Sequence, residues 1–179
     1  MSLAVATSAA ACIIPPDLEP AEATADAGPS SPPVILSASP APEFSFPGPI
    51  VLHRPETRSI ALEVEDSDIA DTTYVRLYVD YNRAPTFMPT PAWADCQQSG
   101  GTAATRIVSC PAASLCTPIG TEDANNHVLE ALVSDRPFIP DSDPQAEGQP
   151  AFRAVAEPAK AATSIRSWLM TCDTAEAPL

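Results

Sequence analysis

Positive charge is scarce in this chain. Its 179 residues include nine lysine and arginine residues against 23 aspartate and glutamate residues, which gives a formal net charge of −14. An acidic surface repels phosphate backbones and anionic lipid headgroups, so we expect no nucleic-acid binding and no electrostatic docking onto a membrane. The acidic composition leaves open a site for divalent cations or for a basic partner.

Long apolar runs and catalytic motifs are missing as well. No run approaches the roughly 18 apolar residues of a transmembrane helix. The sequence contains no GxSxG, no HExxH, no phosphate-binding loop and no glycine-rich dinucleotide turn. Neither His53 nor His127 lies at zinc-ligand spacing to a cysteine pair. We therefore expect a protein that is not an enzyme, with no catalytic residues, no small-molecule substrate and no cofactor other than calcium.

Proline, in contrast, is abundant. The chain has 22 prolines, more than twice the average usage of about 5%. Proline removes a backbone donor and is excluded from helix interiors and central strands. Much of the chain is therefore expected in loops, linkers and edges, and the length suits one domain with flanking segments.

The N-terminal residues 1–11 (MSLAVATSAAA) are small and apolar and lead directly into Cys12. Three alanines before a cysteine resemble the lipobox of bacterial lipoproteins, in which a signal peptide is cut before a cysteine that then receives lipid. Lipoboxes usually carry leucine where Ala9 stands, and no lysine or arginine precedes Arg54. The pattern predicts either a start upstream of Met1 or an unusual signal. The alternative is an alanine-rich tail with an incidental cysteine.

Residues 13–33 (IIPPDLEPAEATADAGPSSPP) are rich in proline, alanine, serine and acid. Such a composition cannot bury enough apolar surface to offset the entropy of ordering. We expect residues 12–33 to form a disordered tether that begins at a lipidated Cys12. An ordinary flexible N-terminus is the alternative, and it has the same physical description.

Alternation of apolar and polar residues predicts a single all-β domain over residues 34–173, followed by a frayed tail at 174–179. Residues 58–81 contain two alternating runs around an aspartate-rich turn, and the simplest interpretation is two antiparallel strands of a β-sandwich. A third run covers 127–138. Residues 82–120 and 139–157 are expected as long loops. Shorter strands are expected at 34–36, 50–52, 103–109 and 164–171, the last with Trp168 as a core anchor.

Four of the five cysteines lie inside this domain, at Cys96, Cys110, Cys116 and Cys172. An even set in an acidic, lysine-poor, proline-rich chain predicts disulfides and an oxidising compartment. Four cysteines allow three pairings, and the sequence does not decide among them. Cys110 and Cys116 are near enough in sequence to close a small loop, with Cys96 or Cys172 closing a larger one.

Two sequence motifs resemble those of bacterial Ig-like and fibronectin-type modules. A strand, an Asp-x-Asp turn and a strand ending in Val-Asp occupy Ile60–Tyr81, and the motif HVLEALVSD occupies His127–Asp135. In those modules the motifs form the B–C hairpin and strand F. The Cys…Trp…Cys spacing of antibody domains is missing. The resemblance implies an Ig-like antiparallel β-sandwich with long proline-rich, disulfide-stapled loops and a disordered N-terminal tether.

With Cys12 and the tether, the whole chain resembles envelope lipoproteins of alanine- and proline-rich proteomes such as those of myxobacteria. This resemblance implies a non-catalytic outer-membrane lipoprotein that faces the periplasm or the cell surface. Its expected partners are the membrane, reached through the lipid anchor, and a larger envelope protein complex, in which it serves as a structural or protein-interaction module.

A surface module that binds calcium or a glycan is the alternative. If strand F runs parallel to strand B, the turns that follow them share one pole and collect acidic side chains. Calcium takes about six to eight oxygen ligands, although aspartates in turns often accept local backbone hydrogen bonds instead. Trp93, in the long excursion, is a candidate partner or carbohydrate contact, or it closes the core beneath the loop. The candidate calcium ligands are Asp66, Asp68, Asp71 and Asp135.

Overall fold

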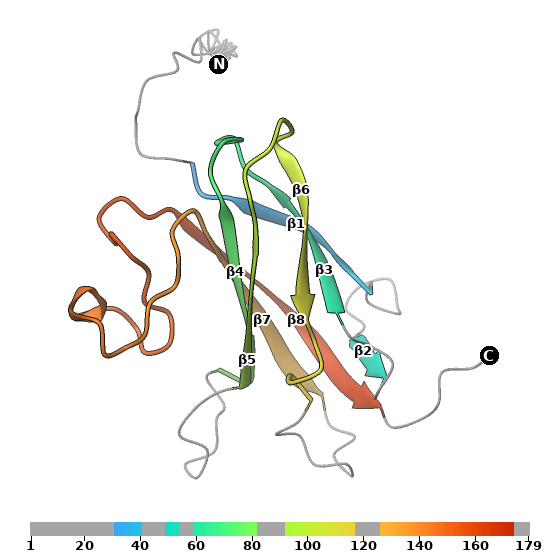
Figure 1. Ribbon diagram of the computed structural model, residues 1–179. Coiled ribbons are helices and arrows are strands. Elements are labelled where there is room, and N and C mark those ends of the chain that lie inside the picture. Colours follow the sequence, from blue (N-terminus) through green and yellow to red (C-terminus); the bar gives the residue numbers. More distant parts are fainter. Residues whose placement is uncertain (1–30, 41–48, 54–58, 82–91, 117–125, 174–179) are drawn as a thin grey trace, which may run out of the picture.

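The structure is a computed structural model that describes residues 31–40, 49–53, 59–81, 92–116 and 126–173 (Figure 1). The predicted signal-like segment, Cys12, nearly all of the tether and the C-terminal tail lie outside these residues. No helix in the described ranges is long and apolar enough to cross a membrane.

The described residues form two β-sheets (Figure 1). The first sheet has three strands in the order β1-β3-β6 and the second has five in the order β2-β8-β7-β4-β5. A single turn of 3₁₀-helix, η1 (Pro144–Ala146), lies between β7 and β8. The strands are β1 (Val34–Ser39), β2 (Ile50–His53), β3 (Ser59–Glu65), β4 (Thr73–Val79), β5 (Ala92–Gln98), β6 (Thr105–Pro111), β7 (His127–Ser134) and β8 (Thr163–Asp173).

Alternating hydrophobicity located most of these strands correctly, because each has one face against a common core. That core draws on both sheets. Trp168 only borders it and is partly buried, so it is not the central anchor that was expected. The side chains with no solvent exposure include Ile60, Leu62 and Val64 of β3, Val75 and Leu77 of β4, and Leu129, Ala131 and Val133 of β7.

The predicted pairing of the first two runs is wrong. β3 pairs with β1 and β6, whereas β4 pairs with β5 and β7, so the aspartate-rich turn passes from one sheet to the other. The other strand pairs are antiparallel, as expected, and β2 departs from this by running parallel to β8. The alternation of apolar and polar residues indicates which face of a strand is buried. It does not indicate which strand lies beside it in the sheet or in which direction that strand runs.

The predicted excursion over residues 82–120 contains a strand that the sequence analysis missed. β5 is an edge strand that pairs with β4 from Thr73↔Gln98 to Val79↔Ala92. Its sequence, AWADCQQ, has no large aliphatic residue at alternate positions. This strand forms without large apolar side chains, because an edge strand borders the core on only part of one face.

Two disulfides tie these elements together. Cys96 of β5 is bonded to Cys110 of β6, which joins the edges of the two sheets, and Cys116 is bonded to Cys172 of β8. The prediction that all four domain cysteines form disulfides is confirmed. The suggested Cys110–Cys116 loop is wrong, because Cys110 lies in a strand whose core-facing side chain meets the opposite sheet.

Candidate functional site

The aspartate-rich turn between β3 and β4 is organised by Arg106 of β6. The guanidinium donates to the backbone oxygens of Asp71 at 2.5 Å and Asp68 at 2.8 Å, and to Thr73 Oγ1 at 3.1 Å. It also lies 3.6 Å from Asp66 Oδ2. A planar group with several donors in a fixed fork is suited to tying several turn oxygens together.

Asp66 is the buried acid of this turn, with only 2% of its surface exposed. Its carboxylate accepts from the Asp68 amide at 3.0 Å and from the Thr73 hydroxyl at 3.3 Å. Burial raises the pKa of Asp66, and the Asp68 amide and the Arg106 charge offset part of that rise. The side chain therefore serves as a local turn acceptor, which is the structural alternative to a calcium ligand.

Two of the other predicted calcium ligands, Asp71 and Asp135, also have side-chain partners within the fold. Asp71 lies 3.6 Å from the Arg136 guanidinium, and Asp135 accepts from the Ala162 amide at 2.9 Å. The Asp71–Arg136 contact confirms that the turns after β3 and β7 share one pole. Even so, within the described ranges no three histidine, cysteine or acidic side chains come together as a metal site requires.

His127 at the start of β7 ties that strand to the end of β4. Its Nδ1 lies 2.6 Å from Asp80 Oδ2, while Asp80 Oδ1 accepts from the Val128 amide at 2.9 Å. The Asp80 amide in turn donates to the Val128 carbonyl. Asp80 thus holds the first residues of β7 through both side chain and backbone, so His127 has a structural partner at this position.

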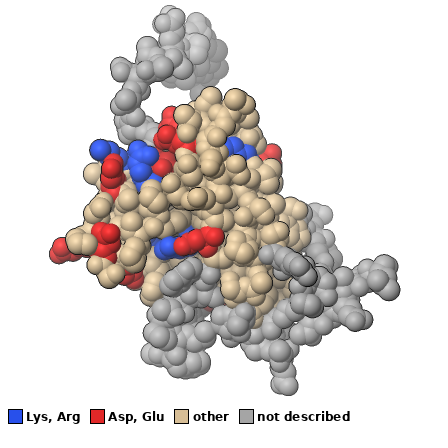
Figure 2. Space-filling view, viewed as in Figure 1, with Lys and Arg blue, Asp and Glu red and all other residues tan. Residues whose placement is uncertain are grey.

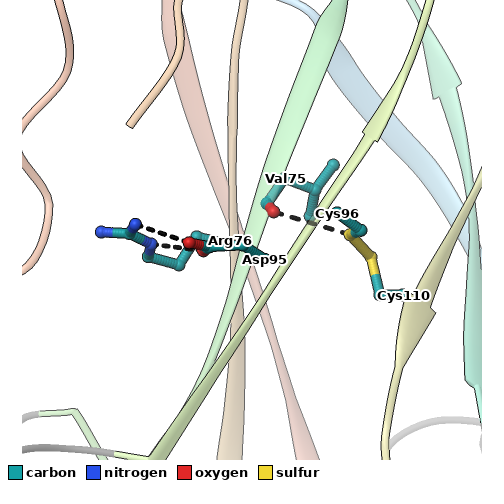
Figure 3. Close-up of a disulfide and its surroundings, with 5 residues drawn as sticks. All are labelled: Val75, Arg76, Asp95, Cys96 and Cys110. Atoms are coloured by element: carbon teal, nitrogen blue, oxygen red, sulfur yellow. Dashed lines mark hydrogen bonds and ion pairs between the residues drawn. A yellow bond between two sulfur atoms is a disulfide. The ribbon is translucent and has the colours of Figure 1, made fainter. Parts of the chain in front are cut away.

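The outer face of the five-stranded sheet carries a second polar cluster. Arg76 of β4 and Asp95 of β5 stand opposite each other in register and form a two-pronged ion pair, with Nε–Oδ1 at 2.5 Å and Nη2–Oδ2 at 2.7 Å (Figure 3). Burial lowers the pKa of Arg76, and the hydrogen bonds and charge of Asp95 more than reverse this, so the guanidinium stays charged.

Figure 3 also shows the Cys96–Cys110 bridge on the opposite side of these strands from the ion pair. The Cys96 sulfur lies 3.5 Å from the Val75 carbonyl oxygen. Because a bridged sulfur has no hydrogen to donate, we regard this as a sulfur–oxygen contact. Neighbouring positions of β5 therefore serve different purposes, one bridging to β6 and one forming a surface ion pair.

The segment 135–162, between β7 and β8, folds back over this outer face (Figure 1). The Phe152 carbonyl accepts from Arg76 Nη1 at 2.8 Å and from the Tyr78 hydroxyl at 2.5 Å. The Tyr81 hydroxyl donates to the Ala151 carbonyl at 2.6 Å. Phe152 has a φ of 60°, which is uncommon outside glycine, and the two donors on its carbonyl fix it there.

Tyr78 and Arg153 complete the contact between the segment and the sheet. Tyr78 is fully buried, and burial raises the pKa of its hydroxyl even though Arg76 acts in the opposite direction. Arg153 forms an ion pair with Glu130 of β7, and its guanidinium lies 3.7 Å from the centre of the Tyr81 ring. Both features favour a fixed position for the segment.

Side-chain hydrogen bonds add to the backbone hydrogen bonds within the segment. Gln149 donates to the Gln145 and Val155 carbonyls and accepts from the Val155 amide, closing the segment into a compact loop. Asp143 accepts from the Gln145 amide at the start of η1, and Asp141 accepts from the Phe152 amide. The predicted proline- and acid-rich loop is thus an ordered structure with its own hydrogen bonds.

A cleft of about 240 Å³ lies where this segment meets the edge of the sheet. Phe138 pairs with Val155 in an isolated antiparallel bridge, and the Arg76 guanidinium lies 4.6 Å from the centre of the Phe138 ring. The wall formed by residues 137 and 138 is therefore held from two sides. The cleft is lined by Tyr74, Asp95, Cys96, Gln97, Pro137 and Phe138.

The predicted contact residue Trp93 belongs to β5, not to a loop. Its backbone pairs with that of Tyr78, two positions along β5 from Asp95. Its side chain lies outside the described part of the structure, so the predicted contact stays a prediction. The sequence analysis selected Trp93 as a loop residue and missed Asp95 and Gln97, for which no sequence motif gave a signal.

The described lysine and arginine side chains lie beside carboxylates or carbonyl oxygens, although acidic side chains outnumber them. Figure 2 shows blue and red atoms adjacent to each other in small groups, with wide uncharged areas between them. Four arginines and one lysine form ion pairs, and Arg166 of β8 donates to the Ile35 and Leu36 carbonyls of β1. Each described lysine and arginine side chain therefore has a partner within the fold.

Comparison of the chain with known protein families, with characterised proteins and with solved structures finds no match.

Proposed function

We propose that this chain is a non-catalytic Ig-like β-sandwich module of the cell envelope, anchored through lipid on Cys12, that binds a protein partner in a larger assembly. The observation that supports it most is the strand order. A three-stranded sheet β1-β3-β6 and a five-stranded sheet β2-β8-β7-β4-β5, linked by a disulfide and sharing one core, support an Ig-like sandwich, which also has two sheets over a common core.

The two disulfides support export. Disulfides persist in oxidising compartments and are rare where thiols are kept reduced. Together they engage all four cysteines of residues 34–173, so none of those four thiols is left for catalysis or metal binding. Cys12 is then the fifth cysteine, at the position where the lipobox-like pattern expects lipid.

Mass spectrometry of the native, unreduced protein tests the export and anchoring together. We expect an acylated Cys12 as the mature N-terminus and two bridges with the pairing described above. Crosslinking in intact envelopes should then capture a protein partner. An unprocessed, reduced chain in the cytosol would refute the export, and an acylated protein that crosslinks to nothing and purifies as a monomer would refute the docking role.

A calcium-binding module is still a prediction without a supporting observation, because the described carboxylates of Asp66, Asp71 and Asp135 have partners within the fold. A melting temperature that rises at millimolar calcium would support it.

A further inference from the structure

We propose that the cleft between the β4–β5 edge and Pro137–Phe138 binds one unit of a neutral carbohydrate. Its volume of about 240 Å³ is below the roughly 300–1,000 Å³ of pockets that enclose drug-sized ligands. A single sugar ring, either free or within a longer chain, is a ligand of suitable size for a cleft of this kind on the molecular surface.

The lining matches the two kinds of surface that a sugar ring presents. Tyr74 and Phe138 offer aromatic rings to the apolar C–H face of the ring. Gln97 offers an amide that both donates and accepts, and Asp95 offers carboxylate oxygens that accept. Hydroxyl groups donate and accept as well, so one sugar can use all of these groups at once.

The charge of the groups that line the cleft indicates whether its ligand is a neutral sugar or a cation. An aromatic ring beside a carboxylate would suit an ammonium group. Here, however, the Asp95 carboxylate is matched by the two-pronged contact from Arg76, whose charge stays in place across the physiological range. Because that pair is locally neutral, the cleft favours neither a cationic nor an acidic ligand.

The cleft is also formed in advance of binding. The Arg76 guanidinium stacks on Phe138, and the Ile139 amide donates to the Ala154 carbonyl at 2.9 Å. On the sheet side, the Tyr74↔Gln97 and Arg76↔Asp95 pairs are fixed by the β4–β5 register. A preformed site avoids the entropic cost of ordering side chains on binding, which matters most for a small, weakly bound ligand.

Amide chemical-shift titration of the ¹⁵N-labelled chain tests the proposal. The probes are the methyl glycosides of glucose, galactose and N-acetylglucosamine, a tetrasaccharide of each sugar, and tetramethylammonium chloride. We expect at least one glycoside to shift the amide signals of Tyr74, Gln97 and Phe138 with a dissociation constant of about 1 mM. A tetrasaccharide that binds at least as well as its glycoside indicates a chain unit, and a weaker one indicates a free monosaccharide.

Gln97→Ala and Gln98→Ala are the matched variants. Both residues are exposed on β5, but strand alternation directs them to opposite faces, and only Gln97 lines the cleft. Loss of one hydrogen-bonding group should weaken sugar binding about fivefold in Gln97→Ala. Binding by Gln98→Ala should stay at the wild-type level. A melting temperature within about 3 °C of wild type confirms that each variant is folded.

Three results would overturn the proposal: no localised shifts with any sugar, equal loss of binding in both variants, or binding of tetramethylammonium without sugar, which would assign the cleft to a cationic ligand. None of them bears on lipidation, export or crosslinking to a protein partner. The carbohydrate site and the anchoring role can therefore fail separately.

Discussion

Arg106 is the residue on which the β3–β4 turn depends most. It supplies hydrogen bonds to three turn residues and the positive charge nearest to the buried carboxylate of Asp66. Removing one partner of a buried ion pair leaves the other charge uncompensated, which typically costs about 3–5 kcal/mol. Arg106→Met should therefore lower the free energy of unfolding by about 3 kcal/mol at neutral pH, as measured by urea denaturation.

Two comparisons make this test specific. Lys160→Met removes a cation from an exposed pair with Glu157, and such pairs contribute about 0–1 kcal/mol. Adding Asp66→Asn to Arg106→Met removes the uncompensated charge and should recover part of the lost stability. If Arg106→Met lowers the free energy of unfolding no more than Lys160→Met does, the buried ion pair between Arg106 and Asp66 is contradicted.

Asp66 and Tyr78 give the stability a defined pH dependence. Both have a pKa raised chiefly by burial, so the folded state holds each proton more tightly than the unfolded state does. Asp66 therefore contributes stability that is complete below about pH 4 and is lost as the pH rises through its folded pKa. The Tyr78 contribution is complete below about pH 10 and is lost in the same direction.

Tyr78→Phe isolates the alkaline part of this dependence. The free energy of unfolding of the wild type should fall as the pH rises above about 10, and the fall should be smaller in Tyr78→Phe. At neutral pH the variant should lose about 1 kcal/mol, the usual contribution of one hydrogen bond, because Arg76 still donates to the Phe152 carbonyl. Denaturation at several pH values measures both effects, and parallel pH profiles would contradict the assignment.

At the scale of elements, sequence alternation predicted strands well where one face meets the core. β3, β4 and β7 were recognised because aliphatic residues recur at every second position. β5 was missed because an edge strand needs little apolar area, and its seven residues include only small, polar and aromatic side chains. The same strand supplies two polar residues of the cleft, so the alternation of apolar and polar residues could not predict the cleft.

The β3–β4 turn and the turn at Gly100–Gly101 approach each other closely. Gly100 lies against the β3–β4 turn, and a Cβ at this position would lie 2.1 Å from the Ala70 carbonyl oxygen. The neighbouring amide of Gly101 donates to the Ile69 carbonyl at 2.7 Å, which holds the two turns together. Backbone atoms cannot move aside as a flexible side chain does, so this approach requires glycine at position 100.

Gly100→Ala should therefore destabilise the fold by about 1–3 kcal/mol, the usual cost of overpacking. Gly101→Ala is the matched control, because nothing lies within 4 Å of a Cβ there and the cost should be within about 0.5 kcal/mol. The thermal unfolding midpoint of each variant measures the difference. Equal midpoints would show that the two turns do not approach as closely as described.

For the whole molecule, the sequence predicted an all-β, disulfide-bonded domain but not how its parts are joined. Which strands pair, and which cysteines bond, depends on contacts between distant segments that no local pattern encodes. The aspartates illustrate this limit: they reach the expected pole, yet Asp66 there meets Arg106, a residue from another strand. A carboxylate next to an internal arginine serves the fold, whereas the same carboxylate alone in a turn would suit a cation.

The two disulfides differ in how much of the unfolded chain they constrain. Cys96 and Cys110 are 14 residues apart, whereas Cys116 and Cys172 are 56 apart. If a bridge acts mainly by reducing the entropy of the unfolded chain, loops of these lengths correspond to about 3 and about 4 kcal/mol. The double replacement Cys116→Ala/Cys172→Ala should thus cost about 1 kcal/mol more than Cys96→Ala/Cys110→Ala.

Both double variants should be made with Cys12→Ala, so that the fifth thiol cannot exchange with the remaining bridge. Urea denaturation then gives the two free energies of unfolding, and the dependence on urea concentration shows whether the unfolded state has expanded. A larger loss in Cys96→Ala/Cys110→Ala would contradict the entropic account. It would indicate that this bridge, which joins the edges of the two sheets, also stabilises the folded state directly.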